Sequence, residues 1–241
     1  MNKKSIARNS LAQIIMILTS VMIIFPLYFM TINSFKTREQ YLVDPVGLPN
    51  PFTLQNYVDA FAGKDFLLWF ANSLILSLGA VALTMIVGLF AGYAFAKMKF
   101  RGRDALFSLI IPLMSVPPVA MLIPLFRTVV KLGMVNTLGS VIFIYCGLCL
   151  PMTVYMIRNF LLSVPDAILE AARIDGANAF VMYWRIAMPL TKPAWMTLLL
   201  FAFQGIWSVT PSAGTIYSEE LKTLPSVMSS ITAGGTARAG A

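Results

Sequence analysis

The sequence EAARIDGANAFVMYWRIAMP, residues 170–189, interrupts a chain that otherwise consists almost entirely of apolar runs. It lies in a polar insert, residues 158–192, which carries four basic and three acidic residues. A segment that only has to sit in lipid needs no such insert. We therefore expect this stretch to contact something outside the membrane.

The composition around the insert is that of an integral membrane protein. Of the 241 residues, 58% are hydrophobic and 12% are charged, whereas a soluble domain carries about 25% charged residues. A membrane helix needs about 20 apolar residues. We expect an all-α, polytopic helical protein with a single domain over residues 1–241 and spans at about 11–35, 67–96, 105–126, 135–157 and 193–209.

The third expected span contains four prolines, which remove backbone donors and clash with the preceding helical turn, so this span is expected to be bent or broken. Basic residues predict the orientation. The N-terminus, the loop 97–104 and the insert 158–192 hold 11 Lys and Arg against 7 on the opposite side. By the positive-inside rule the N-terminus and the insert are cytoplasmic and the polar tail 210–241 is external. The net charge of +8 thus reflects topology and not nucleic-acid binding.

The sequence lacks the residues that several classes of protein function require. The chain has no histidine, and the pair Cys146 and Cys149 lies in an apolar run without a basic neighbour, so we expect inert thiols and no catalytic or metal site. An intramembrane enzyme is therefore disfavoured. The expected spans contain no Asp, Glu, Lys or Arg, which disfavours an ion-coupled secondary transporter, although backbone carbonyls can coordinate sodium. The chain also lacks a phosphate-binding G-x-x-x-x-G-K-[ST] loop.

Within the insert, the pattern predicts two short helices joined by a turn. Ser163 is placed to cap a helix over about 164–175, and Gly176 follows as a residue that can end it. Asn178 is placed to cap the second helix, which Pro189 is expected to end. The first helix has three acids and one arginine, a charge that anionic lipid would repel, so docking to a protein is favoured over an interfacial lipid anchor.

The insert also matches a known pattern. It resembles the EAA loop of ABC importer permeases, EAA-x3-G-x9-I-x-LP, with Met188 in place of leucine as the one departure. The similarity to maltose-type carbohydrate permeases extends over roughly residues 10 to 207. It is carried by Asn72-Ser73, the run Ala91-Gly92-Tyr93-Ala94-Phe95-Ala96, Ile123-Pro124-Leu125-Phe126, Leu132-Gly133 and Asn136-Thr137. We use the name EAA loop for residues 158–192.

The resemblance implies a transmembrane subunit of a carbohydrate importer in a bacterial cell membrane, forming half of the translocation path and having no enzyme activity of its own. It implies as partners a cytoplasmic ABC ATPase dimer that uses ATP and magnesium, a second homologous permease and an extracytoplasmic sugar-binding protein. This chain itself is expected to bind no cofactor and no nucleic acid. A permease for an amino acid, polyamine or phosphate is the alternative. The implied ATPase-coupling residues are Glu170, Ala171, Ala172, Arg173, Asp175, Gly176, Ala177, Ile186 and Pro189.

Other expectations concern the membrane part. Ser115, Gln204 and Trp207 are candidates for the substrate path, with interhelical hydrogen bonding or interface anchoring as the alternative for each. Gly88-x-x-x-Gly92 predicts close helix packing. Because the family usually has six spans, the resemblance also implies a missing sixth span at the C-terminus, either through truncation or in a natural five-span protein.

Overall fold

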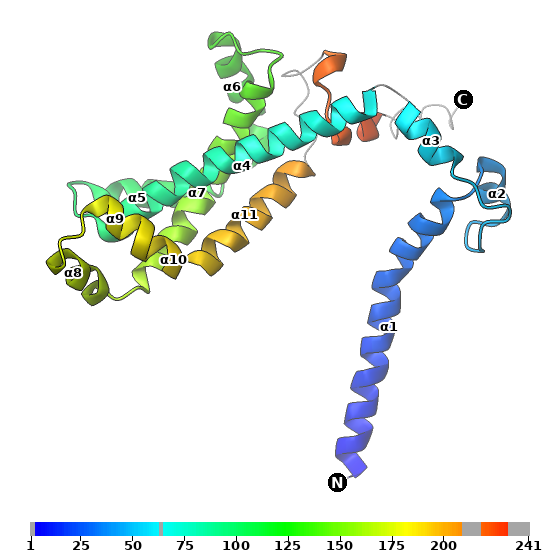
Figure 1. Ribbon diagram of the computed structural model, residues 1–241, viewed down its shortest axis with the longest axis horizontal. Coiled ribbons are helices and arrows are strands. Elements are labelled where there is room, and N and C mark those ends of the chain that lie inside the picture. Colours follow the sequence, from blue (N-terminus) through cyan, green and yellow to red (C-terminus); the bar gives the residue numbers. More distant parts are fainter. Residues whose placement is uncertain (1–2, 63–64, 209–217, 231–241) are drawn as a thin grey trace. The chain divides into compact units, whose positions relative to one another are not determined.

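The computed structural model describes residues 3–62, 65–208 and 218–230, and these residues contain helices and loops but no strand (Figure 1). The expected all-α fold is confirmed. Expectations for residue 209 and for the tail at 210–217 and 231–241 fall outside the described residues. Contacts divide the chain into two units, residues 1–66 and 67–241, which are described separately.

The first unit is a long apolar helix followed by a compact loop. It contains α1 (Lys3–Ser34), α2 (Arg38–Val43) and α3 (Gln55–Ala62). Thr37 and Gln40 form a reciprocal capping box at the start of α2. The Phe35 ring stacks on Phe52 with centroids 4.7 Å apart, which fixes the loop against the end of α1.

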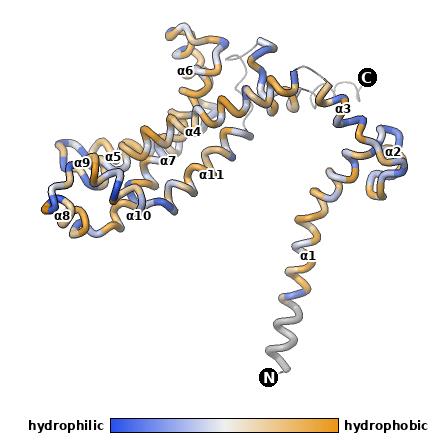
Figure 2. Tube along the Cα trace, viewed as in Figure 1, coloured by the Kyte–Doolittle hydropathy of each residue, from blue (hydrophilic) through white to orange (hydrophobic). Residues whose placement is uncertain are grey.

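The second unit contains the remaining helices. These are α4 (Asp65–Lys97, whose first two residues belong to the first unit), α5 (Arg103–Leu113), α6 (Pro118–Lys131), α7 (Leu138–Leu162), α8 (Asp166–Ile174), α9 (Ala179–Met182), the π-helix η1 (Tyr183–Ala187), α10 (Met188–Leu190), α11 (Lys192–Trp207), the 3-10 helix η2 (Glu219–Leu221) and a helical segment at 224–230. Helices α4, α7 and α11 are apolar along most of their length (Figure 2).

Among the described residues, three helices are long and apolar enough to cross a membrane by themselves. They are Ala12–Ser34, Asp65–Lys97 and Leu138–Leu162, with mean hydropathies of 2.2, 2.5 and 1.9. A fourth candidate is a pair of helical segments, Ala179–Leu190 and Lys192–Ser208, between which the chain bends by 77°. The expected break in the third span, 105–126, is confirmed because α5 ends at Leu113 and α6 begins at Pro118. Two successive prolines, Pro117 and Pro118, supply no N–H to continue the helix.

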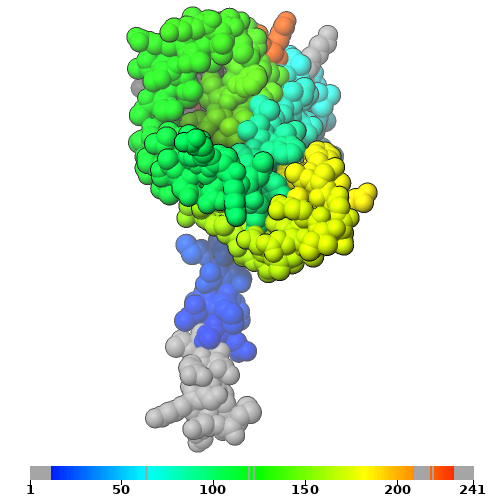
Figure 3. Space-filling view, turned by 90° about the vertical axis from the view of Figure 1, so that its left-hand side faces the viewer, coloured from blue at the N-terminus to red at the C-terminus, as the bar shows by residue number. Residues whose placement is uncertain are grey.

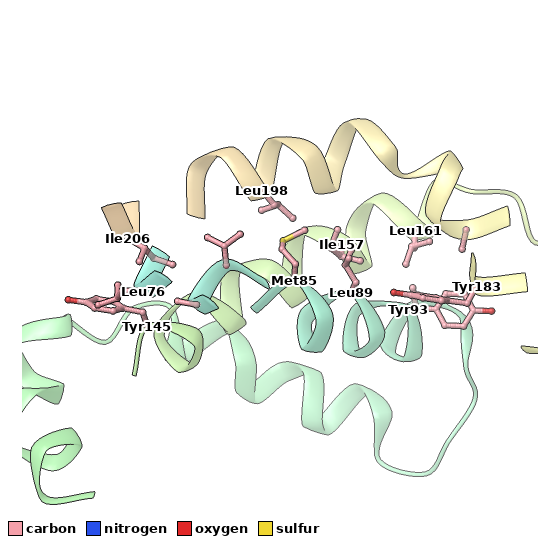
Figure 4. Close-up of a cluster of buried hydrophobic side chains, with 14 of the residues drawn as sticks. Leu76, Met85, Leu89, Tyr93, Tyr145, Ile157, Leu161, Tyr183, Leu198 and Ile206 are labelled. Carbon is pink, nitrogen blue, oxygen red and sulfur yellow. The ribbon is translucent and has the colours of Figure 1, made fainter. Parts of the chain in front are cut away.

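The core of the second unit lies between α4, α7 and α11. Leu198 of α11 lies over Met85 of α4, and Ile157 of α7 lies beside Leu89 (Figure 4). Tyr93 and Tyr183 close this core at its EAA-loop end (Figure 4). The core therefore holds part of the EAA loop directly against the membrane helices.

The two glycines of Gly88-x-x-x-Gly92 lie where α4 and α7 approach each other closely. A Cβ on Gly88 would lie 2.5 Å from Cγ2 of Thr153, and one on Gly92 would lie 2.6 Å from Cγ2 and 2.8 Å from Cβ of Ile157. Both partners belong to α7, and both are buried. The predicted role of this motif in helix packing is confirmed.

Replacing Gly92 by alanine should destabilise the folded chain by about 1–3 kcal/mol, because Ile157 is buried and its Cβ has no room to move. Gly147→Ala in α7 is the matched control, since a Cβ there meets no atom of the described residues within 4 Å. The expected result is a lower midpoint of thermal unfolding in detergent for Gly92→Ala and an unchanged or higher one for Gly147→Ala. Equal midpoints for the two variants would contradict the close crossing of α4 and α7.

At the end of the second unit remote from the EAA loop, polar groups of α4 hold the segment that contains η2. Asn72 donates from Nδ2 to the carbonyl oxygens of Glu220 and Lys222, at 2.7 and 3.0 Å. The N–H of Leu224 donates to Oγ of Ser73 at 2.9 Å. Asn72 and Ser73 are both buried, so these bonds fix the segment to the start of α4.

Candidate functional site

The EAA loop begins later than the sequence predicts. Helix α7 continues to Leu162, so Arg158 is helical and not the first residue of a loop. Its guanidinium carbon lies 3.9 Å from the centroid of the Phe107 ring of α5, a cation–π contact that accommodates the charge at the end of an apolar helix. Phe107 in turn stacks parallel to Tyr155. The loop proper therefore starts at Ser163.

The predicted cap of the first loop helix is wrong. Ser163 is the C-cap of α7, and its hydroxyl donates to the carbonyl of Phe160 at 2.6 Å instead of capping the next helix. Pro165 occupies the N-cap position of α8, and Asp166 is its first helical residue. An acidic side chain in the first turn is favoured by the helix dipole, which supports α8 without a side-chain cap.

Asp166 is also bound to the end of α4. The Nζ atom of Lys97 donates to Oδ1 of Asp166 at 2.6 Å and to the carbonyl of Val164 at 2.7 Å. The hydrogen bond from Lys97, together with its positive charge, holds the pKa of Asp166 below its usual value. The sequence indicates only a role in topology for Lys97, because no local pattern pairs residues 69 positions apart.

The end of α8 is the predicted glycine turn. Gly176 has a φ of +85°. Its N–H donates to the carbonyl of Arg173 at 3.1 Å, and the N–H of Ala177 donates to the carbonyl of Ala172 at 2.9 Å. This pair of bonds is a Schellman motif, which requires a left-handed residue at the position of Gly176. A Cβ built there meets no described atom of the chain within 4 Å, so backbone conformation and not internal packing selects the glycine.

The second loop helix is partly as predicted. Asn178 caps α9, since its Oδ1 accepts from the N–H of Val181 at 2.9 Å. The predicted end at Pro189 is wrong, because Pro189 lies inside α10 and the chain bends at Thr191 instead. The wider π turn, η1, precedes the proline and relieves the clash that its ring makes in a regular α-helix.

Aromatic side chains fasten the second loop helix to α4. The Tyr183 ring stacks on Phe90 with centroids 4.6 Å apart and meets Tyr93 edge-on at 5.2 Å. Trp184 meets the Phe90 ring edge-on at 6.3 Å. These ring contacts are not predicted from the sequence, although aromatics recur at the C-terminal end of α4 and again within η1.

The predicted coupling residues lie at the surface of this end of the second unit. Figure 3 faces it and shows α8 and α9, in yellow-green and yellow, exposed to the viewer. Ile186, like Ala172 and Ala177, is half-buried. The residues that are exposed are Glu170, Ala171, Arg173, Asp175, Gly176 and Pro189.

One apolar residue on this surface was not predicted. The side chain of Ile174 is 87% exposed, whereas Leu169 on the same helix is 7% exposed and faces inward. The two positions differ by about 140° around a regular helix. An isoleucine on the side of the helix away from Leu169, next to the charged residues Arg173 and Asp175, is the sequence signal that could have identified it.

The structure places the substrate-path candidates on two elements. Ser115 is exposed in the turn between α5 and α6, while Gln204 is exposed in the last turn of α11. Trp207, also in α11, stacks on Phe203 and meets Phe70 of α4 edge-on. Trp207 therefore has a packing role, and a contact of any of the three with a transported solute stays a prediction.

Residues 84–232 match the family described as the binding-protein-dependent transport system inner membrane component. This chain belongs to that family. The matched residues run from the middle of α4 through the whole EAA loop, so the family includes both the loop and the helices that hold it.

Individual relatives agree with this assignment. The arabinooligosaccharides transport system permease protein AraQ of Bacillus subtilis (strain 168) is 31% identical over 94% of this chain and 82% of its own length. The diacetylchitobiose uptake system permease protein NgcG of Streptomyces coelicolor (strain ATCC BAA-471 / A3(2) / M145) is 29% identical over 83% of this chain and 66% of its own.

A solved structure shows the same fold. It is a bacterial ABC transporter involved in the import of the acidic polysaccharide alginate, and its matching chain superposes with a TM-score of 0.82 at 22% identity. The match covers 93% of this chain and 79% of that chain. The expected ABC importer permease fold is thereby confirmed, and the chain is a membrane component of a transport system and not an enzyme.

Proposed function

We propose that this chain is the transmembrane subunit of a bacterial ABC importer, forms half of the path for a carbohydrate and receives its driving force through the EAA loop. The observation that carries the proposal is the surface of α8. Small and charged side chains face outward around the open turn at Gly176, while Asp166, Leu169 and Tyr183 attach the loop to the membrane core. A rigid, protruding helix of this kind is suited to a groove in another protein.

The partner that fits this surface is a cytoplasmic ATPase. At the EAA-loop end of the second unit lie eight Lys and Arg, against three at the other end among the described residues, which supports a cytoplasmic location by the positive-inside rule. The same rule puts the N-terminus in the cytoplasm. The ATPase subunit binds ATP and magnesium, and this chain binds neither.

The carbohydrate part of the proposal draws on the relatives. AraQ and NgcG are named for the transport of saccharides, and the superposed structure is named for the import of a polysaccharide. An extracytoplasmic binding protein delivers the sugar, and a second, homologous permease completes the path. Ser115, Gln204 and Trp207 are the residues of this chain proposed to contact the sugar.

Changing Glu170 to lysine tests the coupling role. The carboxylate is exposed on α8, so its replacement leaves the fold intact but presents the wrong charge to the ATPase. We expect uptake of the cognate sugar to fall about tenfold, with less ATPase recovered alongside the permease. Glu170→Gln, which removes the charge without reversing it, should have a smaller effect. Unchanged uptake together with unchanged recovery of the ATPase would contradict the proposal.

A further inference from the structure

We infer that Lys97 is a positioning residue that ties the coupling helix α8 to the end of α4, so that the two helices move together when the ATPase moves. The inference rests on the proposed function of the EAA loop. It assigns the transmission of movement from α8 to α4 to a side chain outside that loop.

The geometry of Lys97 is that of a two-point attachment. Its Nζ contacts the carbonyl of Val164, in the turn before α8, and the carboxylate of Asp166, in the first turn of α8, at 2.7 and 2.6 Å. The side chain of Lys97 is 5% exposed, whereas that of Asp166 is 76% exposed. A lysine side chain that is this little exposed has lost most of its hydration. Its two hydrogen bonds are therefore not readily replaced by hydrogen bonds to water.

Helix electrostatics favour the same arrangement. Lys97 is in the last turn of α4, where the helix dipole is negative, and Asp166 is in the first turn of α8, where it is positive. Each side chain therefore stabilises the end of its own helix as well as its partner. The ion pair joins two helix ends that no backbone hydrogen bond in the described residues connects.

The same stretch of α4 carries a second brace. Phe90 and Tyr93, which lie two turns and one turn before Lys97, hold Tyr183 in the second helix of the loop. Both halves of the EAA loop are thus attached to the last two turns of α4. A displacement of α8 and η1 is expected to reach α4 more directly than α5, whose Phe107 ring contacts Phe95 of α4 and Tyr155 and Arg158 of α7.

At its other end, α4 holds the segment with η2 through Asn72 and Ser73. The 25 residue steps from Asn72 to Lys97 correspond to about 38 Å along a helix, which spans the hydrocarbon core. A single rigid element therefore carries polar attachments on both sides of the membrane. Movement of α8 at the cytoplasmic side is expected to reach the 218–224 segment on the external side through α4.

The alternative is that Lys97 serves only as one of the cations that set topology. Lys99 is the control that distinguishes these two roles, because it follows Lys97 by two residues, carries the same charge and is exposed. Its charge also acts on Asp166, but it is not the hydrogen-bond donor that holds α8. Lys97→Met and Lys99→Met remove the same charge from the same side of the membrane.

The test uses the whole importer, with the partner permease, the ATPase and the binding protein, reconstituted in liposomes. Sugar uptake and ATP hydrolysis are measured on the same vesicles, and the uptake per ATP is the readout. We expect Lys97→Met to lower this ratio about tenfold, within the range of coupling free energies. Recovery of the ATPase with the permease should stay normal, and Lys99→Met should behave as the unmodified chain.

A ratio within twofold of the unmodified chain for Lys97→Met would overturn the inference. Loss of the ATPase from the Lys97→Met complex would overturn it as well, because Lys97 would then shape docking and not transmission. If Lys97→Met does not reach the membrane, Asp166→Ala takes its place, since its side chain is exposed. That variant is expected to lower the ratio about threefold, and an unchanged ratio overturns the inference.

The result for Gly176→Val distinguishes a failure of the proposed function of the EAA loop from a failure of the role of Lys97. If Gly176→Val retains full uptake, the proposed function of the EAA loop fails. If Gly176→Val abolishes uptake while Lys97→Met and Asp166→Ala keep the normal ratio, only the role of Lys97 fails.

Discussion

Replacing Gly176 by valine is expected to reduce sugar uptake by about 100-fold or more, the scale of losing a central interface contact, while the chain still inserts and packs its core. Gly176 has a φ of +85°, where a side chain costs about 1–2 kcal/mol and a β-branched one more. The strain acts on the Schellman turn that sets the direction between α8 and α9. The valine side chain also projects into space that this chain leaves open and that the ATPase is proposed to occupy.

A second glycine provides the matched control. Gly133 has a φ of +67°, and a Cβ there also meets nothing within 4 Å, but it lies in the loop between α6 and α7 at the other end of the unit. Gly133→Val thus carries similar backbone strain without touching the EAA loop. We expect uptake near that of the unmodified chain for Gly133→Val. Equal losses in the two variants, with equal membrane levels by immunoblot, would attribute the Gly176 effect to strain and not to docking.

Changing Ile174 to aspartate is expected to weaken association of the ATPase about 30-fold. Burying an isoleucine at an interface contributes about 1.5–3 kcal/mol, and a carboxylate in its place adds a desolvation cost. Since the side chain is 87% exposed in this chain, its replacement leaves internal packing unchanged. The measurement is ATPase binding to the purified permease pair in detergent, where no lipid surface contributes.

Ile168 serves as a control on the same helix, because its side chain is 42% exposed and points in a different direction from Ile174. Ile168→Asp should weaken ATPase binding less than Ile174→Asp. A pair of variants that both bind the ATPase as tightly as the unmodified chain would show that Ile174 lies outside the ATPase interface. Intact binding would thereby remove the main apolar anchor from the proposed interface.

Local signals predicted the parts of this chain that depend on short sequence separations. Gly176 and Asn178 lie at the turn and the cap that their side chains favour, because those conformations involve a few consecutive residues. The proline break between α5 and α6 follows from missing backbone donors. The glycines of α4 predicted close packing, though not that Thr153 and Ile157 of α7 are their partners.

Tertiary contacts overrode local preference elsewhere. Serine is a residue type that favours the N-cap position, yet the hydroxyl of Ser163 donates back to a carbonyl of α7. Helix α7 can extend past Arg158 because the guanidinium of that residue lies over a ring of α5. Pro189 does not end its helix, because the π turn before it is held in place by the stacking of Tyr183 on α4. The attachment of Lys97 to α8 has no signal in the sequence, since it joins segments far apart in the chain.

A site-specific crosslink determines whether α8 and its glycine turn dock on the ATPase. A photo-crosslinking residue is placed at the exposed Ala171 in the complete importer, and in a control at Phe143, which is exposed on the apolar surface of α7. Irradiation should yield an adduct with the ATPase from position 171 and none from position 143, with a yield that changes when ATP is added. Absence of an ATPase adduct from position 171, in vesicles that still take up sugar, would contradict the assignment of the EAA loop.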